Sequence, residues 1–94
     1  MVELQPGEFF QRVDLDELVV PDAVVELIPE SLARQICVLA IELAGDRLTV
    51  AVSDPFNFEA IEKLRFALNR EFNIVVDSPA RIWSAIDRHY RHTE

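Results

Sequence analysis

The side chains best able to do chemistry in this chain are its two histidines and its single cysteine. His89 and His92 are three positions apart near the end of a predicted helix, a spacing that can chelate a metal ion. Because the chain has no third histidine and Cys37 is distant in the sequence, we favour a packed His89 and a solvated His92. Apolar neighbours favour a buried structural role for Cys37, since a nucleophilic thiol needs a basic neighbour to lower its pKa. We therefore predict no metal site, no catalytic residue and no enzymatic activity.

The acidic residues Asp14, Asp16 and Glu17 form a second candidate group, because clustered carboxylates can bind a divalent cation. The spacing of an EF-hand loop and the glycine of its turn are both absent here. A solvated acidic turn is therefore the interpretation that we favour. No other pair of acids has a spacing that defines a cleft, so general acid–base catalysis is not indicated.

The arginines form a third group. Arg81 and Arg88 share one face of the last predicted helix, and together with Arg65 and Arg91 they could bind an anion. We favour the simpler alternative of a solvated helix face whose arginines pair with Asp87 and Glu62. The chain has only two glycines and no Gly-x-x-x-x-Gly-Lys-Ser/Thr phosphate loop, so it cannot form a P-loop nucleotide site. No cofactor is predicted.

The composition limits the possible partners. The chain has 94 residues, enough for one small domain, and a formal net charge of −8. Nucleic acids and anionic membranes both need a basic surface, so neither is expected as the main partner. No window approaches the roughly 18 apolar residues that span a bilayer, and no secretory signal is recognised. A single cysteine suits a reducing compartment, so we expect a cytoplasmic domain without membrane insertion.

The hydrophobic pattern predicts the elements that would position these residues. Residues 1–9 include a Pro-Gly pair and are expected to form an irregular leader, 10–91 a single domain and 92–94 a frayed tail. Apolar residues at helical or alternating spacing define the regular elements. The expected helices span about 22–28, 30–36, 57–70 and 79–91, and the expected strands span 38–43, 47–53 and 72–77.

The connections between these elements predict the fold class. A Gly-Asp turn joins the first two strands into an antiparallel hairpin. The helix between the second and third strands should be a right-handed crossover, which makes those strands parallel. That helix is expected to begin at the N-cap Asn57 and to bury a stripe that includes Phe58, Ile61 and Leu64. We predict a two-layer α+β sandwich with a three-stranded mixed sheet.

Several strings of residues match one known family. They are Val13-Asp14-Leu15-Asp16, Leu27-Ile28-Pro29-Glu30-Ser31-Leu32-Ala33-Arg34, Gly45-Asp46-Arg47-Leu48-Thr49-Val50-Ala51-Val52-Ser53-Asp54-Pro55 and Ile86-Asp87-Arg88-His89-Tyr90. Through them the chain resembles the N-terminal domain of the ATPases of type II secretion and type IV pilus assembly. This is the N-terminal domain family of general secretory pathway protein E, and the resemblance covers about residues 10–91.

The resemblance implies a non-catalytic adaptor domain. In that family the domain precedes the motor domains and docks on the cytoplasmic part of an inner-membrane platform protein. We therefore expect a protein partner, with the domain in the cytoplasm at the face of that membrane. Some members bind cyclic di-GMP through upstream motifs that begin Arg-Leu-Gly, but nothing like Arg-Leu-Gly-x-x-Leu precedes Val13, so this ligand is not expected. A nucleotide-sensing domain that uses Arg81 and Arg88 is the alternative.

An acidic and partly aromatic surface would suit a basic protein partner. Phe56 and Trp83 would extend such a surface if they are exposed. The residues expected to contact the partner are Phe9 and Phe10, as apolar anchors, and Asp14, Asp16 and Glu17, as complementary charges.

Overall fold

The computed structural model describes residues 11–90, which form one short 3-10 helix, four α-helices and three strands. The predicted leader (1–9) and tail (92–94) lie outside the described residues. Each predicted element is present, with ends within three residues of the expected ones, and the 3-10 helix is an addition. In chain order the elements are η1 (Leu15–Glu17), α2 (Asp22–Val25), α3 (Glu30–Ile36), β1 (Val38–Ala44), β2 (Arg47–Val52), α4 (Phe58–Leu68), β3 (Phe72–Val76) and α5 (Pro79–Tyr90).

The strands form one mixed sheet in the order β1-β2-β3. β1 runs antiparallel to β2, and the turn between them places Gly45 at φ +65°, a conformation that glycine adopts without steric cost. β2 and β3 are parallel, with Leu48 opposite Phe72, as the crossover through α4 requires. Beyond β3, Arg12 forms a parallel bridge with Val76. The predicted mixed sheet and the α+β fold class are confirmed.

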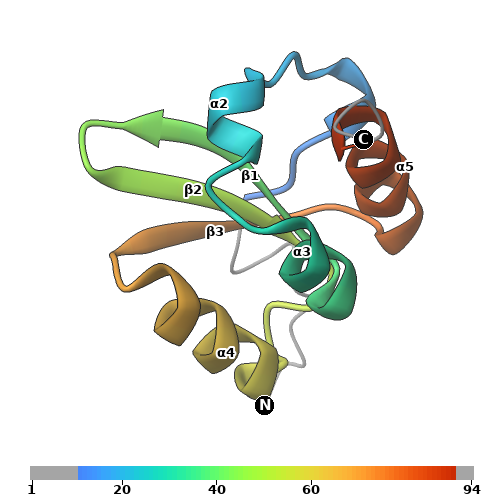
Figure 1. Ribbon diagram of the computed structural model, residues 1–94. Coiled ribbons are helices and arrows are strands. Elements are labelled where there is room, and N and C mark those ends of the chain that lie inside the picture. Colours follow the sequence, from blue (N-terminus) through green and yellow to red (C-terminus); the bar gives the residue numbers. More distant parts are fainter. Residues whose placement is uncertain (1–10, 91–94) are drawn as a thin grey trace.

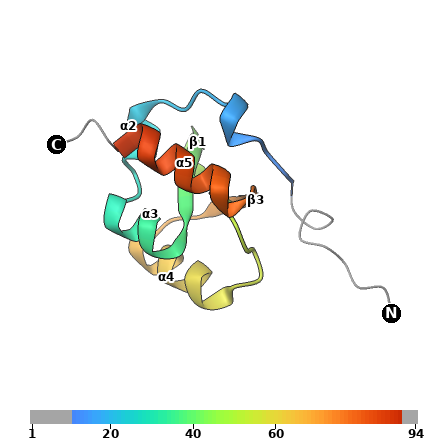
Figure 2. The ribbon, with the colours of Figure 1, turned by 90° about the vertical axis from the view of Figure 1, so that its right-hand side faces the viewer.

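The helices gather around one end of the sheet. α2, α3 and α5 contact β1, and α5 also contacts β2 and η1. In Figure 1, α4 lies at the lower edge of the molecule beside β3, while the β1–β2 hairpin projects to the left beyond the helices. The view in Figure 2 shows α5 in front of the sheet between α2 and α3. Within residues 11–90, no helix has the length and apolar character needed to cross a membrane.

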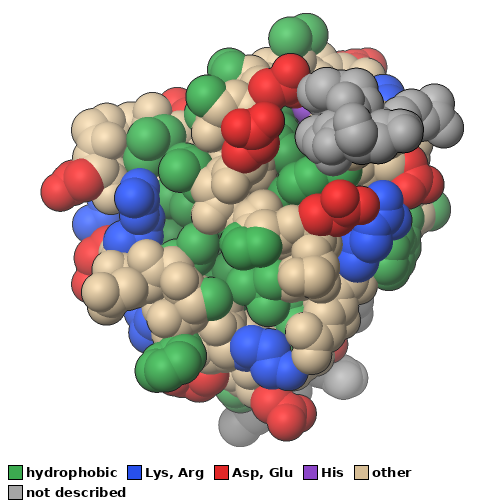
Figure 3. Space-filling view, in the orientation of Figure 1, with side chains coloured by type: hydrophobic (Ala, Val, Ile, Leu, Met, Phe, Trp, Pro, Cys, Tyr) green, Lys and Arg blue, Asp and Glu red, His purple; other side chains and the backbone are tan. Residues whose placement is uncertain are grey.

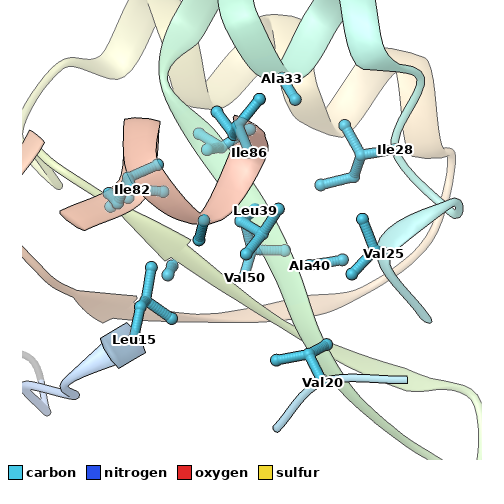
Figure 4. Packing of buried hydrophobic residues seen from close by; sticks show 14 of the residues in the cluster. Leu15, Val20, Val25, Ile28, Ala33, Leu39, Ala40, Val50, Ile82 and Ile86 are labelled. Carbon is cyan, nitrogen blue, oxygen red and sulfur yellow. The ribbon is translucent and has the colours of Figure 1, made fainter. Parts of the chain in front are cut away.

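The hydrophobic core joins residues from the sheet and from every helical segment. Figure 4 labels members of it from η1, α2, α3, α5 and the sheet. Leu39 and Val50 of the sheet are fully buried beneath Ile82 and Ile86 of α5. Each such aliphatic side chain contributes about 1.5–3 kcal/mol relative to exposure in water. The N-terminal third of the chain adds Leu15, Val20, Val25 and Ile28, all of them buried. Packing against the sheet therefore holds even the short elements η1 and α2 in place.

One helix is shorter than expected, and one expectation about the core was wrong. The helix predicted over 22–28 ends at Val25, because the backbone then tightens into turns toward Pro29 and a residue before proline disfavours the helical conformation. Phe58 was expected in the core but is 70% exposed. At about 100° per residue, Phe58 lies about 60° from Ile61 and 120° from Leu64 around the helix axis. It therefore falls at the margin of the buried stripe and faces solvent.

Candidate functional site

Asp77, directly after β3, is a buried carboxylate that connects distant parts of the chain. Asp77 is only 2% exposed. Its Oδ2 accepts a hydrogen bond from the backbone N–H of Leu15 at 2.9 Å. Its Oδ1 accepts from the N–H of Ser78 at 2.7 Å and from the guanidinium of Arg81 at 3.1 Å. Such charge-assisted bonds compensate for removing the carboxylate from water, so Asp77 fastens η1 to the start of α5.

Arg81 links this buried carboxylate to the predicted acidic turn. Its Nε lies 3.3 Å from Asp14 Oδ1 and 3.5 Å from Asp16 Oδ2. The hydrogen bond with Asp77, with the charge of Asp14 in support, raises the pKa of Arg81 above its ordinary value. One arginine therefore balances three carboxylates.

The acidic turn thus has a structural role within the domain. Asp14 caps η1 by accepting a hydrogen bond from the N–H of Asp16 at 3.0 Å. Arg88 donates to the carbonyl of Leu15 at 3.2 Å, and its guanidinium lies 3.9 Å from Asp16. The arginines were expected to pair with Asp87 and Glu62. Arg65 does lie 3.8 Å from Glu62. Arg81 and Arg88 pair with Asp14, Asp16 and Asp77 instead, and Asp87 pairs with Arg34. Glu17 is exposed and has no ion pair among residues 11–90.

The structure therefore brings together three of the five predicted contact residues, Asp14, Asp16 and Glu17. Phe9 and Phe10 lie outside the described residues, and contact of any of the five with a partner stays a prediction. Sequence reasoning missed Asp77. The available signal was its position between a strand and the N-cap Ser78, whose hydroxyl accepts from the N–H of Arg81 at 3.2 Å. Nothing in the sequence connects Asp77 with Leu15, 62 positions away.

The histidine and cysteine candidates occupy packed positions. Cys37 is the C-cap of α3 with φ 57°, and partial burial raises the pKa of its thiol. A thiol that stays protonated is a poor nucleophile. His89 is 15% exposed, with Nδ1 3.6 Å from Asp22, whereas His92 lies outside the described residues. Over residues 11–90, no three His, Cys, Asp or Glu side chains are grouped as a metal site would require.

A second network ties α3 to α5. Arg34 donates to Glu30 at 2.9 Å and to Asp87 at 3.0 Å, and its guanidinium lies 5.9 Å from the centre of the Trp83 ring. These hydrogen bonds raise the pKa of Arg34 above its ordinary value. Trp83 is 39% exposed, so the sequence expectation that it extends a docking surface is consistent with its position.

Among residues 11–90, the most exposed aromatic side chains lie on α4. Phe66 is 90% exposed and Phe58 70%, while Phe56 just before the helix is 41% exposed. Figure 3 shows a hydrophobic side chain standing out at the lower left, over α4, with basic and acidic groups around it. Aromatic side chains this exposed are typical of contact surfaces.

An open groove of about 1000 Å³ lies between the N-terminal segment and the sheet. Residues from β1 and β3 line it together with Val13, Leu18 and Val19. Among its described lining residues Glu42 is the one charged side chain. Arginine and lysine are common phosphate-binding groups, and neither lines this groove among residues 11–90.

Comparison with protein families assigns almost the whole chain to one domain family. The family model of the MshEN domain matches residues 8–94. The type IV pilus assembly ATPase PilB of Myxococcus xanthus (strain DK1622) is 32% identical over 78 residues, or 83% of this chain and 14% of PilB. The chain therefore corresponds to a small part of that relative.

Solved structures show the same domain. A structure of MshE with cdg (cyclic di-GMP) has a TM-score of 0.84 and 32% identity over 88% of this chain and 60% of its own. Two crystal forms of the XpsE N-terminal domain have TM-scores of 0.75 and 0.78 at 22% identity, over 86% and 89% of this chain and 58% and 61% of theirs, which shows a shared fold. The chain belongs to the MshEN domain family, the N-terminal domain of type II secretion and type IV pilus ATPases.

Proposed function

We propose that this chain is a non-catalytic interaction domain that docks a secretion or pilus motor, or a regulator, on a protein at the cytoplasmic face of the inner membrane. It would act in the cytoplasm, as a single domain over 10–91 with an irregular leader and a short tail. The domain family supports the setting, because its relatives are ATPases of those systems. The single observation that carries the docking role is the exposed and firmly anchored stretch from Asp16 to Val19.

This stretch has the properties of a contact surface. Asp16 and Glu17 carry negative charge, Leu18 is 39% exposed and Val19 is 97% exposed. The bonds from Asp77 and Arg88 to Leu15 hold the segment on α5, so little conformational entropy would be lost on binding. Acidic groups around apolar anchors favour a partner with a basic rim and an apolar centre.

The test is a binding titration against the cytoplasmic part of the platform protein of the same system. Glu17→Lys and Val19→Ser should each weaken binding about tenfold or more, because one reverses a rim charge and the other removes an apolar contact. Asp46→Lys is the matched control, since it makes the same charge change at the exposed hairpin turn. Equal effects of Glu17→Lys and Asp46→Lys would remove this stretch from the docking surface.

Cyclic di-GMP sensing is the second candidate function. A relative with 32% identity was solved with this dinucleotide, which weighs against our expectation that the ligand is absent. Arg81 and Arg88 both belong to α5, but carboxylates already engage both. A phosphate would have to displace those carboxylates, so we place this function second.

Calorimetry with cyclic di-GMP separates the two candidates. Heat at micromolar concentration that disappears in Arg88→Ala would support sensing through α5. Heat that persists in Arg88→Ala would point to a site elsewhere in the chain. If no heat is observed at millimolar ligand, the docking function remains as the proposal.

A further inference from the structure

The outer edge of β3, which faces away from β2, is only partly paired. The N–H of Val76 donates to the carbonyl of Gln11 at 2.9 Å, and the carbonyl of Val76 accepts from the N–H of Val13 at 3.0 Å. This bridge is isolated, so pairing along the edge ends there. In a strand the two backbone groups of alternate residues point to the same side. The N–H and C=O groups of Ile74 and Phe72 therefore point outward, and no backbone group within residues 11–90 pairs with them there.

The open groove described above lies next to this edge. Gln11 and Val13 line it together with residues 72–75 of β3. In Figures 1 and 2, α4 lies below β3, whereas the segment from η1 to α2 passes above the sheet, so the groove and α4 are on opposite sides. A strand added at the edge would project alternate side chains into the groove.

We propose that the partner of this docking domain adds an extended segment to the edge of β3, with alternate side chains of that segment in the groove. The inference rests on the proposed docking function and deepens it by naming the chemistry of the partner. In strand addition, main-chain hydrogen bonds hold the peptide and pockets select its side chains. Phe72 and Ile74 each offer an N–H and a C=O to the added strand.

The side chains around the groove specify the composition of that segment. Glu42 is the one charged lining residue among residues 11–90, and the other described lining side chains are apolar or neutral. Leu18 and Val19 also line the groove and directly follow the exposed acid Glu17. A segment with an apolar side chain and a lysine or arginine two positions apart matches both the apolar lining and the negative charge.

Two other occupants suit the edge less well. The first ten residues of the chain contain Glu3 and Glu8, no lysine or arginine, and the Pro6-Gly7 pair, which interrupts a strand. A second copy of the chain carries the same net charge of −8, so charge repulsion opposes its approach. A basic segment of a different protein meets neither obstacle.

Binding titrations against the cytoplasmic part of the platform protein test the added strand. Ile74→Pro removes an outward N–H but leaves the ladder with β2, which uses the alternate residues, so it should weaken binding about tenfold. Ile74→Val keeps the N–H and is the matched control. Glu42→Lys should also weaken binding about tenfold, whereas Asp46→Lys at the hairpin turn should not. Equal binding by folded Ile74→Pro and Ile74→Val overturns the proposal.

Amide hydrogen exchange of the unchanged chain needs no substitution. The amide of Ile74 should exchange rapidly in the free chain and at least tenfold more slowly in the complex. Protection of this amide in the dilute free chain would assign the edge to the chain's own first residues. Protection that appears only as the free chain is concentrated would assign it to a second copy. Either result overturns the proposal.

The added strand and the docking function fail separately. If Glu17→Lys and Val19→Ser weaken binding but Ile74→Pro and Glu42→Lys do not, the docking function stands and the added strand is overturned. The same holds if the partner binds while the Ile74 amide exchanges as fast as in the free chain. If the unchanged chain does not bind the platform protein at all, both proposals are overturned.

Discussion

At the scale of single residues, Asp77 is the side chain on which the N-terminal segment most depends. Asp77→Asn removes one charged acceptor from a site that serves Leu15, Ser78 and Arg81. We expect the free energy of unfolding to fall by about 1–3 kcal/mol, measured by urea denaturation. Asp87→Asn, whose side chain is 59% exposed, is the control and should cost less than about 1 kcal/mol. If both variants lose the same free energy of unfolding, the buried bonds of Asp77 contribute no more to stability than the exposed ion pair of Asp87.

Tyr90 gives the molecule a defined response to alkali. Its hydroxyl bonds the carbonyls of Val25 at 2.9 Å and Ile28 at 2.6 Å, and burial, with help from the charge of Glu30, raises its pKa to about 12. Because this pKa exceeds the ordinary value of about 10, the stabilisation is complete below about pH 10 and is lost as the pH rises toward 12. Denaturation midpoints should therefore fall over that interval.

The single tyrosine of the chain makes this prediction easy to follow, since phenolate absorbance reports Tyr90 alone. Tyr90→Phe should lower the free energy of unfolding by about 1 kcal/mol at neutral pH, because a hydrogen bond is lost. The denaturation midpoint of this variant should fall less between pH 10 and 12 than that of the unchanged protein. A phenolate titration centred near pH 10 in the folded protein would contradict the burial argument.

Residue roles were predictable where they depend on near neighbours. Asn57 caps α4 as expected, and Ser78 caps α5 in the same way, because a cap bonds an amide three positions ahead and both partners are visible in the sequence. The role of Asp77 depends on Leu15, which only the folded chain brings near. The exposure of Phe58 likewise depends on where α4 meets the sheet, which spacing alone does not specify.

At the scale of elements, α4 should be sensitive to its cap because it buries little. Asn57 Oδ1 accepts the N–H of Ala60 at 3.2 Å, and the helix buries only Ile61 and Leu64. Asn57→Ala should lower the free energy of unfolding by about 1 kcal/mol, whereas Asn57→Asp should preserve it. Chemical denaturation of the three proteins measures the difference. A loss for Asn57→Asp as large as for Asn57→Ala would show that the cap is not what stabilises this end.

The longer elements were predicted with nearly correct ends, whereas η1 was not predicted and α2 was predicted three residues too long. α3, α5 and the three strands carry several periods of apolar residues, so their pattern identifies them. η1 and α2 have three and four residues, too few for a period and too few to form alone. Their conformation comes from burial of Leu15 and Val25 against the rest of the core. Sequence reasoning therefore placed the scaffold better than the segment that carries the proposed docking surface.

At the scale of the whole molecule, stability is unevenly distributed. α5 buries Ile82, Ala85, Ile86 and Tyr90 and contacts η1, α3, β1 and β2. α4 buries half as many residues and lies at the edge of the molecule beside β3 (Figure 1). Helices with few buried contacts open at a lower free-energy cost than the core. The helix that exposes Phe58 and Phe66 is thus less constrained by the fold than α5.

Native-state hydrogen exchange should reveal this difference directly. We expect the amides of α5 and of β2, the central strand, to exchange only through global unfolding, and those of α4 to exchange faster, through local opening. Urea at low concentration should accelerate exchange in β2 and α5 more than in α4, because global unfolding exposes more surface than local opening. Equal protection of α4 and α5 would instead mean that α4 is held as firmly as the core.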